Sequence, residues 1–356
     1  LIIMPNSYAV LMPSLKVGGG NRVSLQFARE AVNDQKKCKL FYLDRKGEVF
    51  DNPFSNSISQ KVFGDGVLSI VFFSIILSFK VRLDKSVDSV IVSDPILSIF
   101  SIIYANKKIT RFVQSNDYLL FDSNSKGGKV FNLIYKYLFR VSQKYSYHSV
   151  VFNSKYSLNS YNDSLNNKNY SEKNIAHPAV FTIGHKKDVI DHPNEDLIKV
   201  CVVTNNHPRK GYREFLEIAK HSRLEGVCYT VISQDNLNSK LENVTHVKPD
   251  SDDEYVETLK NCHFFLSTSV FEGFGLPLIE AMALGVVPIA YHNPGMDEYN
   301  VEKNISIIKN VDDFDTIICK MINNTEEYLK ISESVVKSSS LFTSQNFYLS
   351  ITNKFL

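Results

Sequence analysis

Short apolar runs recur along the first half of the chain, separated by segments long enough to form helices. A helix is predicted over Asn21 to Asn33, after the first of these runs. The apolar runs themselves predict strands at Tyr8–Met12, Lys39–Leu43, Ser89–Ser93, Ile109–Gln114 and Ser149–Asn153. Strands separated by helix-length intervals are typical of a parallel sheet with crossover helices. The first half is therefore predicted to form an α/β domain.

The same pattern restarts after a poorly periodic stretch, Pro178 to Asn194, which we interpret as a linker. Strands are predicted at Ile198–Val203, Val227–Ser233 and Phe264–Leu266, and helices at Tyr212–His221 and Tyr255–Asn261. Two successive α/β halves predict a cleft between domains, where ligands usually bind. The expected division is a first domain over residues 1–178, a linker over 179–195, a second domain over 196–340 and a C-terminal segment over 341–356.

Length and composition indicate a globular protein of two domains. A chain of 356 residues is too long for one compact core. Its 44% hydrophobic and 22% charged residues are typical of globular proteins, and a net charge of +2 gives no general attraction to polyanions, so we expect no nucleic-acid partner. The five cysteines are scattered and odd in number, which favours reduced thiols and argues against disulfides or a zinc site. The first residues lack the pattern of a secretion signal, and we expect a cytoplasmic protein.

One segment of the second half concentrates polar groups between a strand and a helix. Glu272, expected at the strand end, and Glu280 enclose Gly273 and Gly275, which let the backbone approach a ligand closely. Pro277 fits the first turn of the following helix, where a missing N–H costs nothing. Free N–H groups and the positive end of the helix dipole would then face an anion. Because a carboxylate on either side can bind hydroxyls, the segment predicts a site for a phosphate flanked by two polyols, as in a nucleotide sugar.

An ordinary strand–loop–helix junction explains the same residues about equally well. Gly-x-Gly loops are common, and glutamates cap helices without contacting a ligand. The surrounding sequence is what favours the functional interpretation.

That surrounding sequence resembles the E-x7-E signature of retaining glycosyltransferases with the GT-B fold, in particular those of family 4. The match runs from Ser267 to Gly285, continues as a strand over Val287–Ala290 and includes the loop Asn293–Glu298. The resemblance covers nearly the whole chain and is densest from Ile198 to Glu298. It implies a GT-B architecture, in which two Rossmann-like, doubly wound parallel-sheet domains face a central cleft. It also implies that a C-terminal helix, here within 341–356, crosses back to the first domain.

The resemblance also implies roles for individual residues. Glu272 would contact the transferred sugar, and Glu280 would hold the ribose of the donor nucleotide. The donor diphosphate would lie against the amides of the intervening loop, formed by Gly273, Phe274, Gly275 and Leu276. We do not expect the metal-bridged diphosphate of the other major transferase fold, and so we expect that no metal and no other cofactor is required.

Three glycines, Gly18, Gly19 and Gly20, follow the first strand and open a helix. Either they lack side chains because the backbone must approach a ligand closely here, or they form a flexible turn. The resemblance favours the first interpretation, because many family members carry a Gly-Gly pair here that faces the donor diphosphate and the acceptor. Arg22 is a candidate for an additional charge at this place.

A second basic candidate lies after the first strand of the second half. Lys210, in a Lys-Gly pair with Gly211, is placed to neutralise a diphosphate leaving group as a point charge. The family usually has an arginine five residues before this pair, whereas this chain has Asn205 there. Arg209 is the candidate replacement. A solvated Arg-Lys pair is the alternative.

The strand that ends near Gln114 resembles the Val-Gln-Asp-Tyr strand end of rhamnosyl- and related family 4 transferases, with an inserted Ser-Asn. Polar groups at the carboxyl end of a parallel strand face the crevice. Gln114, Asn116 and Asp117 are therefore acceptor or donor-sugar candidates. A simple turn closed by the Asn-Asp pair is equally compatible with these residues.

Two segments of the first half are candidates for peripheral contact with an anionic membrane. Between Ser123 and Asn162 there is no acidic residue, and six basic residues are interleaved with aromatic and aliphatic ones, so residues 126–148 predict a basic amphipathic helix. The alternative is an ordinary helix packed on the sheet. Residues 67–79 form a thirteen-residue apolar run, shorter than the ~20 residues needed to span a bilayer, so we expect a buried or interface-facing helix and no transmembrane span.

The resemblance implies transfer of a hexose or deoxyhexose from a nucleoside diphosphate sugar to a saccharide or lipid-linked saccharide, with retention at the anomeric carbon, in bacterial surface polysaccharide (O-antigen or capsule) synthesis. A Rossmann oxidoreductase is disfavoured because Gly18–Gly20 lacks the Gly-x-Gly-x-x-Gly spacing, and Asp44 is the only candidate acid for a ribose. A non-catalytic transferase-like subunit that binds the membrane or a partner enzyme remains open, and Asn205 is its best support.

Overall fold

The computed structural model of the protein describes residues 6–16, 18–45, 54, 57–64, 66–115, 126–165, 170–185 and 192–353. The chain forms two compact units. The first comprises Leu1–Ala179 together with Ser344–Leu356, and the second comprises Val180–Thr343. The sequence analysis predicted boundaries between the segments of the chain after residues 178, 195 and 340.

The first unit is built on a six-stranded parallel sheet whose order is β3-β2-β1-β4-β5-β6. Its strands are β1 (Ser7–Met12), β2 (Lys37–Asp44), β3 (Ile58–Lys61), β4 (Ser89–Val92), β5 (Lys108–Val113) and β6 (Ser149–Phe152). All five strands predicted for the first half are present. The strand order reverses between β1 and β4, and in such doubly wound sheets the crevice at the reversal binds ligands.

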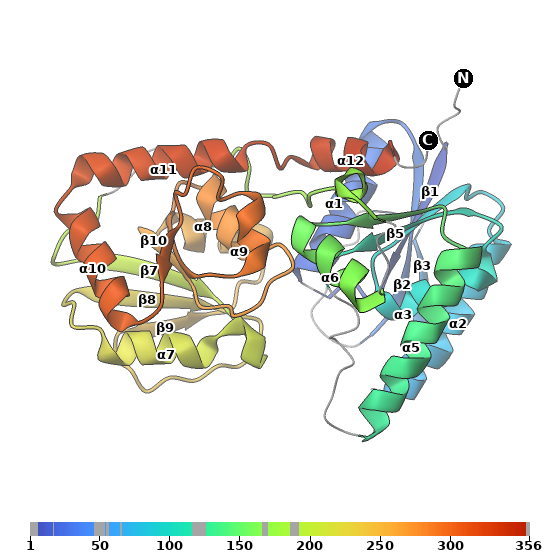
Figure 1. Ribbon diagram of the computed structural model, residues 1–356, viewed down its shortest axis with the longest axis horizontal. Coiled ribbons are helices and arrows are strands. Elements are labelled where there is room, and N and C mark those ends of the chain that lie inside the picture. Colours follow the sequence, from blue (N-terminus) through green and yellow to red (C-terminus); the bar gives the residue numbers. More distant parts are fainter. Residues whose placement is uncertain are drawn as a thin grey trace. The chain divides into compact units, whose positions relative to one another are not determined.

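The helices of the first unit are α1 (Gly19–Asn33), α2 (Val67–Leu83), α3 (Pro95–Ile99), η1 (Ser101–Tyr104), α5 (Lys126–Tyr145), α6 (Lys155–Leu165), η2 (Glu172–Asn174) and α12 (Ser344–Thr352). The C-terminal helix α12 packs on α1, where Phe347 and Tyr348 contact the ring of Phe27. The Tyr348 hydroxyl donates to Asp34 at 2.8 Å. The last helix of the chain is therefore part of the first unit (Figure 1).

The second unit repeats the topology of the first. Its parallel sheet has the order β12-β11-β10-β7-β8-β9, so its strand order reverses between β7 and β10. The strands are β7 (Ile198–Val203), β8 (Val227–Ile232), β9 (Val244–Val247), β10 (Phe264–Ser267), β11 (Val287–Tyr291) and β12 (Ser306–Ile308). The helices are η3 (Pro208–Lys210), α7 (Tyr212–His221), α8 (Asp252–Lys260), α9 (Leu276–Ala283), η4 (Pro294–Glu298), α10 (Val311–Ile322) and α11 (Thr325–Ser339).

Helices cover both faces of the second sheet, because successive side chains of a strand point to opposite faces. Phe264 and Leu266 pack into a core with residues of α7 and α10, whereas Phe265 packs into a core with residues of α8, α9 and α11. Figure 1 shows these helices around the second sheet. This burial leaves the loops at the strand ends to carry polar chemistry.

Within the described residues, the structure contains no helix long and apolar enough to cross a membrane. The apolar helix α2 is buried on one side, at Leu77 and Val81, and exposes Leu68, Phe72 and Leu83.

Candidate active site

The carboxyl ends of β7 and β10 lie side by side at the strand-order reversal of the second sheet. The loops that leave these two strands, residues 204–211 and 268–275, carry most of the site residues that the sequence indicates for the second half. Since β10 ends at Ser267, Glu272 lies within the following loop and not at the strand end, where the sequence placed it.

The two loops are held together at Gly211. This residue has φ +68°, and a Cβ added to it would lie 1.9 Å from the carbonyl oxygen of Thr268, so only glycine fits. The Thr268 hydroxyl donates to the Gly211 carbonyl at 2.7 Å, and the Thr204 hydroxyl donates to the Lys210 carbonyl at 2.9 Å. The backbone around Lys210 is thereby fixed from both loops.

Lys210 and Glu272 form an ion pair across the reversal. The distance from Lys210 Nζ to Glu272 Oε1 is 2.6 Å, and the side chains are 30% and 16% exposed. A half-buried pair is screened less by solvent than a surface pair. The structure thus brings together the cation and the carboxylate for which the sequence indicated separate roles.

The glycine loop between Glu272 and α9 has the left-handed turn that its sequence suggests. Gly275 has φ +87° and is the N-cap residue of α9, with Pro277 in the first turn. A Cβ on Gly275 would approach the Tyr299 hydroxyl to 2.8 Å. That hydroxyl donates to the Gly275 carbonyl at 3.2 Å, and burial, followed by the nearby Glu272, raises the pKa of Tyr299 well above its ordinary value. Tyr299 therefore stays neutral and supports the loop as a hydrogen-bond donor.

Glu280 lies in α9 and is 2% exposed. Its Oε2 accepts a hydrogen bond of 2.8 Å from the Tyr255 hydroxyl of α8, and its carbonyl accepts one of 2.8 Å from the Thr182 hydroxyl. A buried carboxylate needs such partners because its desolvation is costly. The structure therefore places Glu280 in a polar network below the loop.

Arg209 and Asn205 lie close to the ion pair in the chain. The Arg209 guanidinium stacks over Phe271, with its Cζ 5.6 Å from the ring centroid. The backbone carbonyl of Arg209 accepts the N–H of Val270 at 3.0 Å. Asn205 Oδ1 accepts the N–H of His207 at 2.9 Å, as asparagine commonly does in turns. Asn205 thus has a structural function in the loop, and Arg209 is fixed beside the loop that contains Glu272.

In the first unit, the glycine loop and the end of β5 come together. Gln114 Nε2 donates to the Gly20 carbonyl at 3.2 Å, and a Cβ on Gly20 would lie 3.0 Å from Gln114 Oε1. Gly18 is the N-cap residue of α1, whose first residues are Gly19 and Gly20, and its carbonyl accepts the N–H of Arg22 at 2.9 Å. The predicted residues Asn116 and Asp117 lie outside the described part of the chain.

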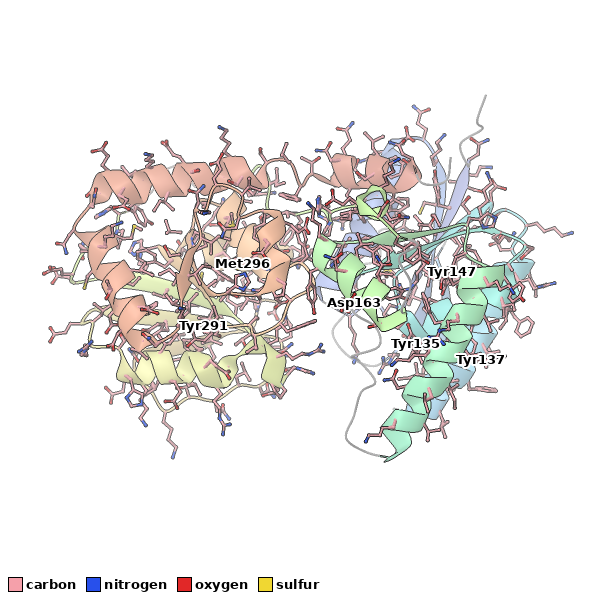
Figure 2. The ribbon with its side chains drawn as sticks, in the orientation of Figure 1. Tyr135, Tyr137, Tyr147, Asp163, Tyr291 and Met296 are labelled. Carbon is pink, nitrogen blue, oxygen red and sulfur yellow. The ribbon has the colours of Figure 1, made fainter. Side chains whose placement is uncertain are left out.

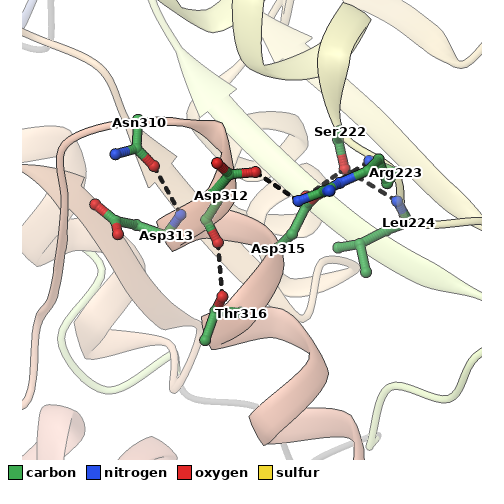
Figure 3. A network of polar contacts seen from close by, with 8 residues as sticks. All are labelled: Ser222, Arg223, Leu224, Asn310, Asp312, Asp313, Asp315 and Thr316. Atoms are coloured by element: carbon green, nitrogen blue, oxygen red, sulfur yellow. Dashed lines mark hydrogen bonds and ion pairs between the residues drawn. The ribbon is translucent and has the colours of Figure 1, made fainter.

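Two Asp-x-Asp tripeptides, a motif that bridges metal and diphosphate in other transferases, occur at residues 250–252 and 313–315. Both lie at helix starts and not in the loops of the site. Asp315 accepts bonds from the Ser222 hydroxyl at 2.6 Å and the Arg223 N–H at 2.9 Å, and Asp313 accepts the Lys309 N–H at 2.8 Å. Figure 3 shows the contacts of Asp315 with Ser222 and Arg223, which join the start of α10 to the segment that follows α7.

Sequence reasoning assigned no role to several residues that surround or support the site, namely Thr204, Thr268, Tyr255, Tyr299 and Asn293. For Tyr255 and Tyr299 no local signal existed, since the residues next to each tyrosine do not indicate what its hydroxyl contacts. For Thr204 and Thr268 the signal was a hydroxyl directly after a buried strand, a position where polar groups face the ligand. Asn293 had been included only as the first residue of a loop.

Comparison with known proteins agrees with this geometry. Residues 186–337, which lie within the second unit, match the family model described as Glycosyl transferases group 1. None of the curated proteins compared with the chain matches its sequence.

The whole chain is similar in fold to solved glycosyltransferase structures. WaaG, a glycosyltransferase involved in lipopolysaccharide biosynthesis, superposes with a TM-score of 0.75 at 13% identity, covering 97% of this chain and 98% of that chain. Sucrose-phosphate synthase from Thermosynechococcus elongatus gives 0.76 at 14% identity, covering 98% of both. HepE from Anabaena in complex with UDP and glucose gives 0.72 at 14% identity, covering 99% of both. At these identities the likeness shows the fold, which is GT-B, as the sequence predicted.

Proposed function

We propose that the protein is a glycosyltransferase that moves a sugar from a nucleoside diphosphate sugar to the hydroxyl of a saccharide or lipid-linked saccharide. The observation that carries this proposal is the ion pair between Lys210 and Glu272 at the strand-order reversal of a Glycosyl transferases group 1 domain. Ligands of doubly wound folds bind at this reversal. The pair supplies a cation for a leaving group and a carboxylate for a sugar at one place.

The donor would bind over the Gly273–Leu276 loop and the start of α9. The positive end of the helix dipole favours the diphosphate, and Lys210 adds a point charge. Glu280, held by Tyr255 beneath the loop, would accept hydrogen bonds from the ribose hydroxyls. Since HepE was solved with UDP and glucose, UDP-glucose is the first donor to test.

Charge develops on the departing diphosphate during transfer. Stabilising that charge with fixed groups is often the largest catalytic contribution, and Lys210 would provide it without a metal. Glu272 would orient the sugar and stabilise positive charge on its ring. We propose retention at the anomeric carbon, with the leaving diphosphate accepting the acceptor proton, and a hexose or deoxyhexose as the transferred group.

A panel of UDP, GDP, dTDP, ADP and CMP, each with and without magnesium, tests the donor site by thermal shift. A ligand that binds only the folded state must raise the melting temperature. We expect a metal-independent shift with one diphosphate, and its loss in Glu280→Ala. If no nucleotide gives a shift, the non-catalytic subunit suggested by Asn205 becomes the better explanation.

We further propose that the acceptor is lipid-linked and that helices α2 and α5 contact an anionic membrane from the cytoplasmic side. Helix α5 buries Tyr135 and Phe139 but exposes a second apolar stripe with helical spacing, made of Val130, Leu133, Ile134 and Tyr137. Tyr135 and Tyr137 are labelled on α5 in Figure 2.

The chemistry around this stripe fits a lipid surface. Lys129, Arg140 and Lys144 of α5 are exposed, and helix α2 adds the exposed side chains of Leu68 and Phe72. Both helices pack against α3 and η1 and so lie near each other. Exposed apolar residues among basic ones are typical of peripheral membrane contacts. A lipid-linked acceptor would agree with a role in surface polysaccharide synthesis, as WaaG has in lipopolysaccharide biosynthesis.

Sedimentation with anionic liposomes at low salt tests the membrane contact. We expect binding that neutral liposomes do not give and that Leu133→Glu together with Ile134→Glu abolishes. Val301→Glu is the matched control, because Val301 is an exposed apolar residue of the second unit. Equal sedimentation of all three proteins, or none for the wild type, would refute the contact.

A further inference from the structure

Asn293, in the turn between β11 and η4, has a buried side-chain amide to which the proposed transfer reaction assigns no role. The residue is 1% exposed, and within the described residues neither its Oδ1 nor its Nδ2 has a hydrogen-bond partner. Buried side-chain amides are nearly always hydrogen-bonded, so an unpaired one requires an explanation.

The usual explanation for an asparagine at this position does not apply. Asn293 is the N-cap residue of η4, where an asparagine side chain commonly accepts a helix N–H, but it makes no such bond. By contrast, Asn310 caps α10 in the ordinary way, with Oδ1 accepting the N–H of Asp313 at 2.9 Å. The amide of Asn293 is therefore directed to something other than its own helix.

The chain packs this turn directly against the loop that carries Glu272. A Cβ on Gly295 would lie 2.7 Å from the Glu272 carbonyl and 2.8 Å from the Phe274 nitrogen, so only glycine permits the approach. Met296, which is labelled in Figure 2, is fully buried and packs into the core of the second unit. Asn293 is consequently held at the floor of the candidate active site.

A small cavity lies beside Asn293. Its volume is about 10 Å³, and its lining includes the polar residues Ser267, Ser269, Glu272 and Asn293 and the apolar Phe265 and Leu278. A single water molecule needs roughly 10–15 Å³ and two to four polar partners, and this cavity offers both. It is too small for a sugar ring or a phosphate.

We propose that Asn293 is a positioning residue that holds Glu272 through one buried water molecule. Lys210 bonds Oε1 of Glu272, so the water would donate to Oε2 and accept from, or donate to, the Asn293 amide. This inference rests on the proposed transferase function. During transfer Lys210 is drawn to the departing diphosphate, and the contact through Asn293 keeps Glu272 oriented when its cationic partner turns away.

Two substitutions of nearly equal volume separate hydrogen bonding from packing. Asn293→Ala removes the polar group, whereas Asn293→Ser keeps a hydroxyl and leaves space for a further water. With UDP-glucose, or the donor found by the nucleotide panel, we expect Asn293→Ala to lower kcat by about tenfold or more with little change in the donor KM. Asn293→Ser should recover a substantial part of kcat at the same melting temperature as Asn293→Ala.

Asn310→Ala is the matched control, because it removes an asparagine of the same unit that serves only as a helix cap. It should lower the melting temperature and leave kcat at the wild-type value. If Asn293→Ala is as active as the wild type, or if Asn293→Ala and Asn293→Ser lose kcat equally, the positioning role is refuted while the transferase function stands.

A crystal structure provides a readout that does not depend on activity. We expect an ordered water within hydrogen-bonding distance of both Asn293 and Glu272. Its absence, in electron density that shows other buried waters, would overturn the inference even if the transferase function is confirmed. Conversely, a wild-type protein with neither transfer activity nor a nucleotide-induced shift would refute the proposed function, whether or not this water is present.

Discussion

The two units of the protein share one strand order but differ in how tightly their loops are built at the reversal. In the second unit, Gly211 is locked against Thr268 and an ion pair joins Lys210 to Glu272. In the first unit, a Cβ added to Gly18 would meet nothing within 4 Å, and the loop is held by weaker contacts such as that between Gln114 and Gly20.

This difference shows that a doubly wound strand order alone does not make a catalytic site. A doubly wound sheet supplies a crevice in either unit, because loops leave its carboxyl edge in opposite directions. Catalytic electrostatics additionally require fixed charges, and in the described residues of the two reversals such a pair is found in the second. Under the proposed function, the open glycine loop and exposed helices of the first unit would suit variable acceptors, since loops on a rigid scaffold tolerate change.

Removing the cation of the ion pair in the second unit should have the largest effect on activity. Lys210→Ala is expected to lower kcat by about 10²–10³-fold, because the departing diphosphate loses its fixed cation. The measurement is a steady-state rate with the identified donor, together with a melting temperature to show that the variant folds.

Lys260→Ala is the control for this variant. Lys260 also forms an ion pair in the second unit, 3.2 Å from Glu257, but it lies in the last turn of α8 and its carboxylate partner is exposed. It should retain wild-type activity, since surface pairs contribute little. Wild-type activity in Lys210→Ala would contradict the catalytic assignment.

Two glycine substitutions, one in each unit, test the difference in loop packing. Gly211→Ala should destabilise the protein by at least about 3 kcal/mol, because its Cβ meets the Thr268 carbonyl and its φ of +68° is unfavourable for other residues. Gly18→Ala should change the free energy of unfolding by less than about 1 kcal/mol, since its φ of 171° is ordinary extended backbone. Denaturant unfolding of both variants measures the difference, and equal losses would show that the first loop is as tightly packed as the second.

Tyr255→Phe tests whether Glu280 depends on its hydrogen bond from Tyr255 for folding and for ligand binding. Loss of the hydroxyl leaves a buried carboxylate oxygen without its 2.8 Å donor and should cost about 1–3 kcal/mol of folding free energy. The thermal shift produced by the preferred nucleoside diphosphate should also shrink. Tyr212→Phe is the control, because its hydroxyl donates to the Asn238 carbonyl at the surface. If both variants respond equally to nucleotide, Glu280 does not depend on Tyr255 for ligand binding.

The smallest expected effect concerns a charge pair of the first unit that lies away from any proposed chemistry. Burial alone would raise the pKa of Asp84, but the hydrogen bonds from Lys39 and Ser86 outweigh it and lower the pKa below its ordinary value of 3.8. A depressed pKa contributes stability that is present above the unfolded-state pKa and is lost as pH falls through the folded-state value.

Asp84→Asn should therefore lower the free energy of unfolding by up to about 1 kcal/mol at pH 7. The gap to the wild type should close as pH falls below about 4. Urea unfolding across this range checks the sign. A gap that persists in acid would show that Asp84 stabilises through packing and not through its charge.

Much of the fold could be predicted from the sequence, and the misses share a cause. The long strands β1, β2 and β7 were found because their apolar runs are nearly continuous, as both faces of a parallel strand are buried. The edge strands β3 and β9 were missed because they are short and half-exposed, and so carry polar residues.

The candidate site divides in the same way. The Glu272–Glu280 segment was recognisable because a strand, two glycines and a helix start follow one another directly in the chain. The support that Asn293 is inferred to give this segment could not be recognised, because it depends on Gly295 bringing two distant loops into contact.

The sequence by itself determined two parallel α/β sheets and a glycine loop between two glutamates, since periodicity and motifs are properties of neighbouring residues. Only the tertiary structure decided that Lys210 pairs with a carboxylate 62 residues away, and that Glu280 is bonded to Tyr255. The physical reason is the strand order, because the reversal between β7 and β10 makes neighbours of loops that the chain keeps apart.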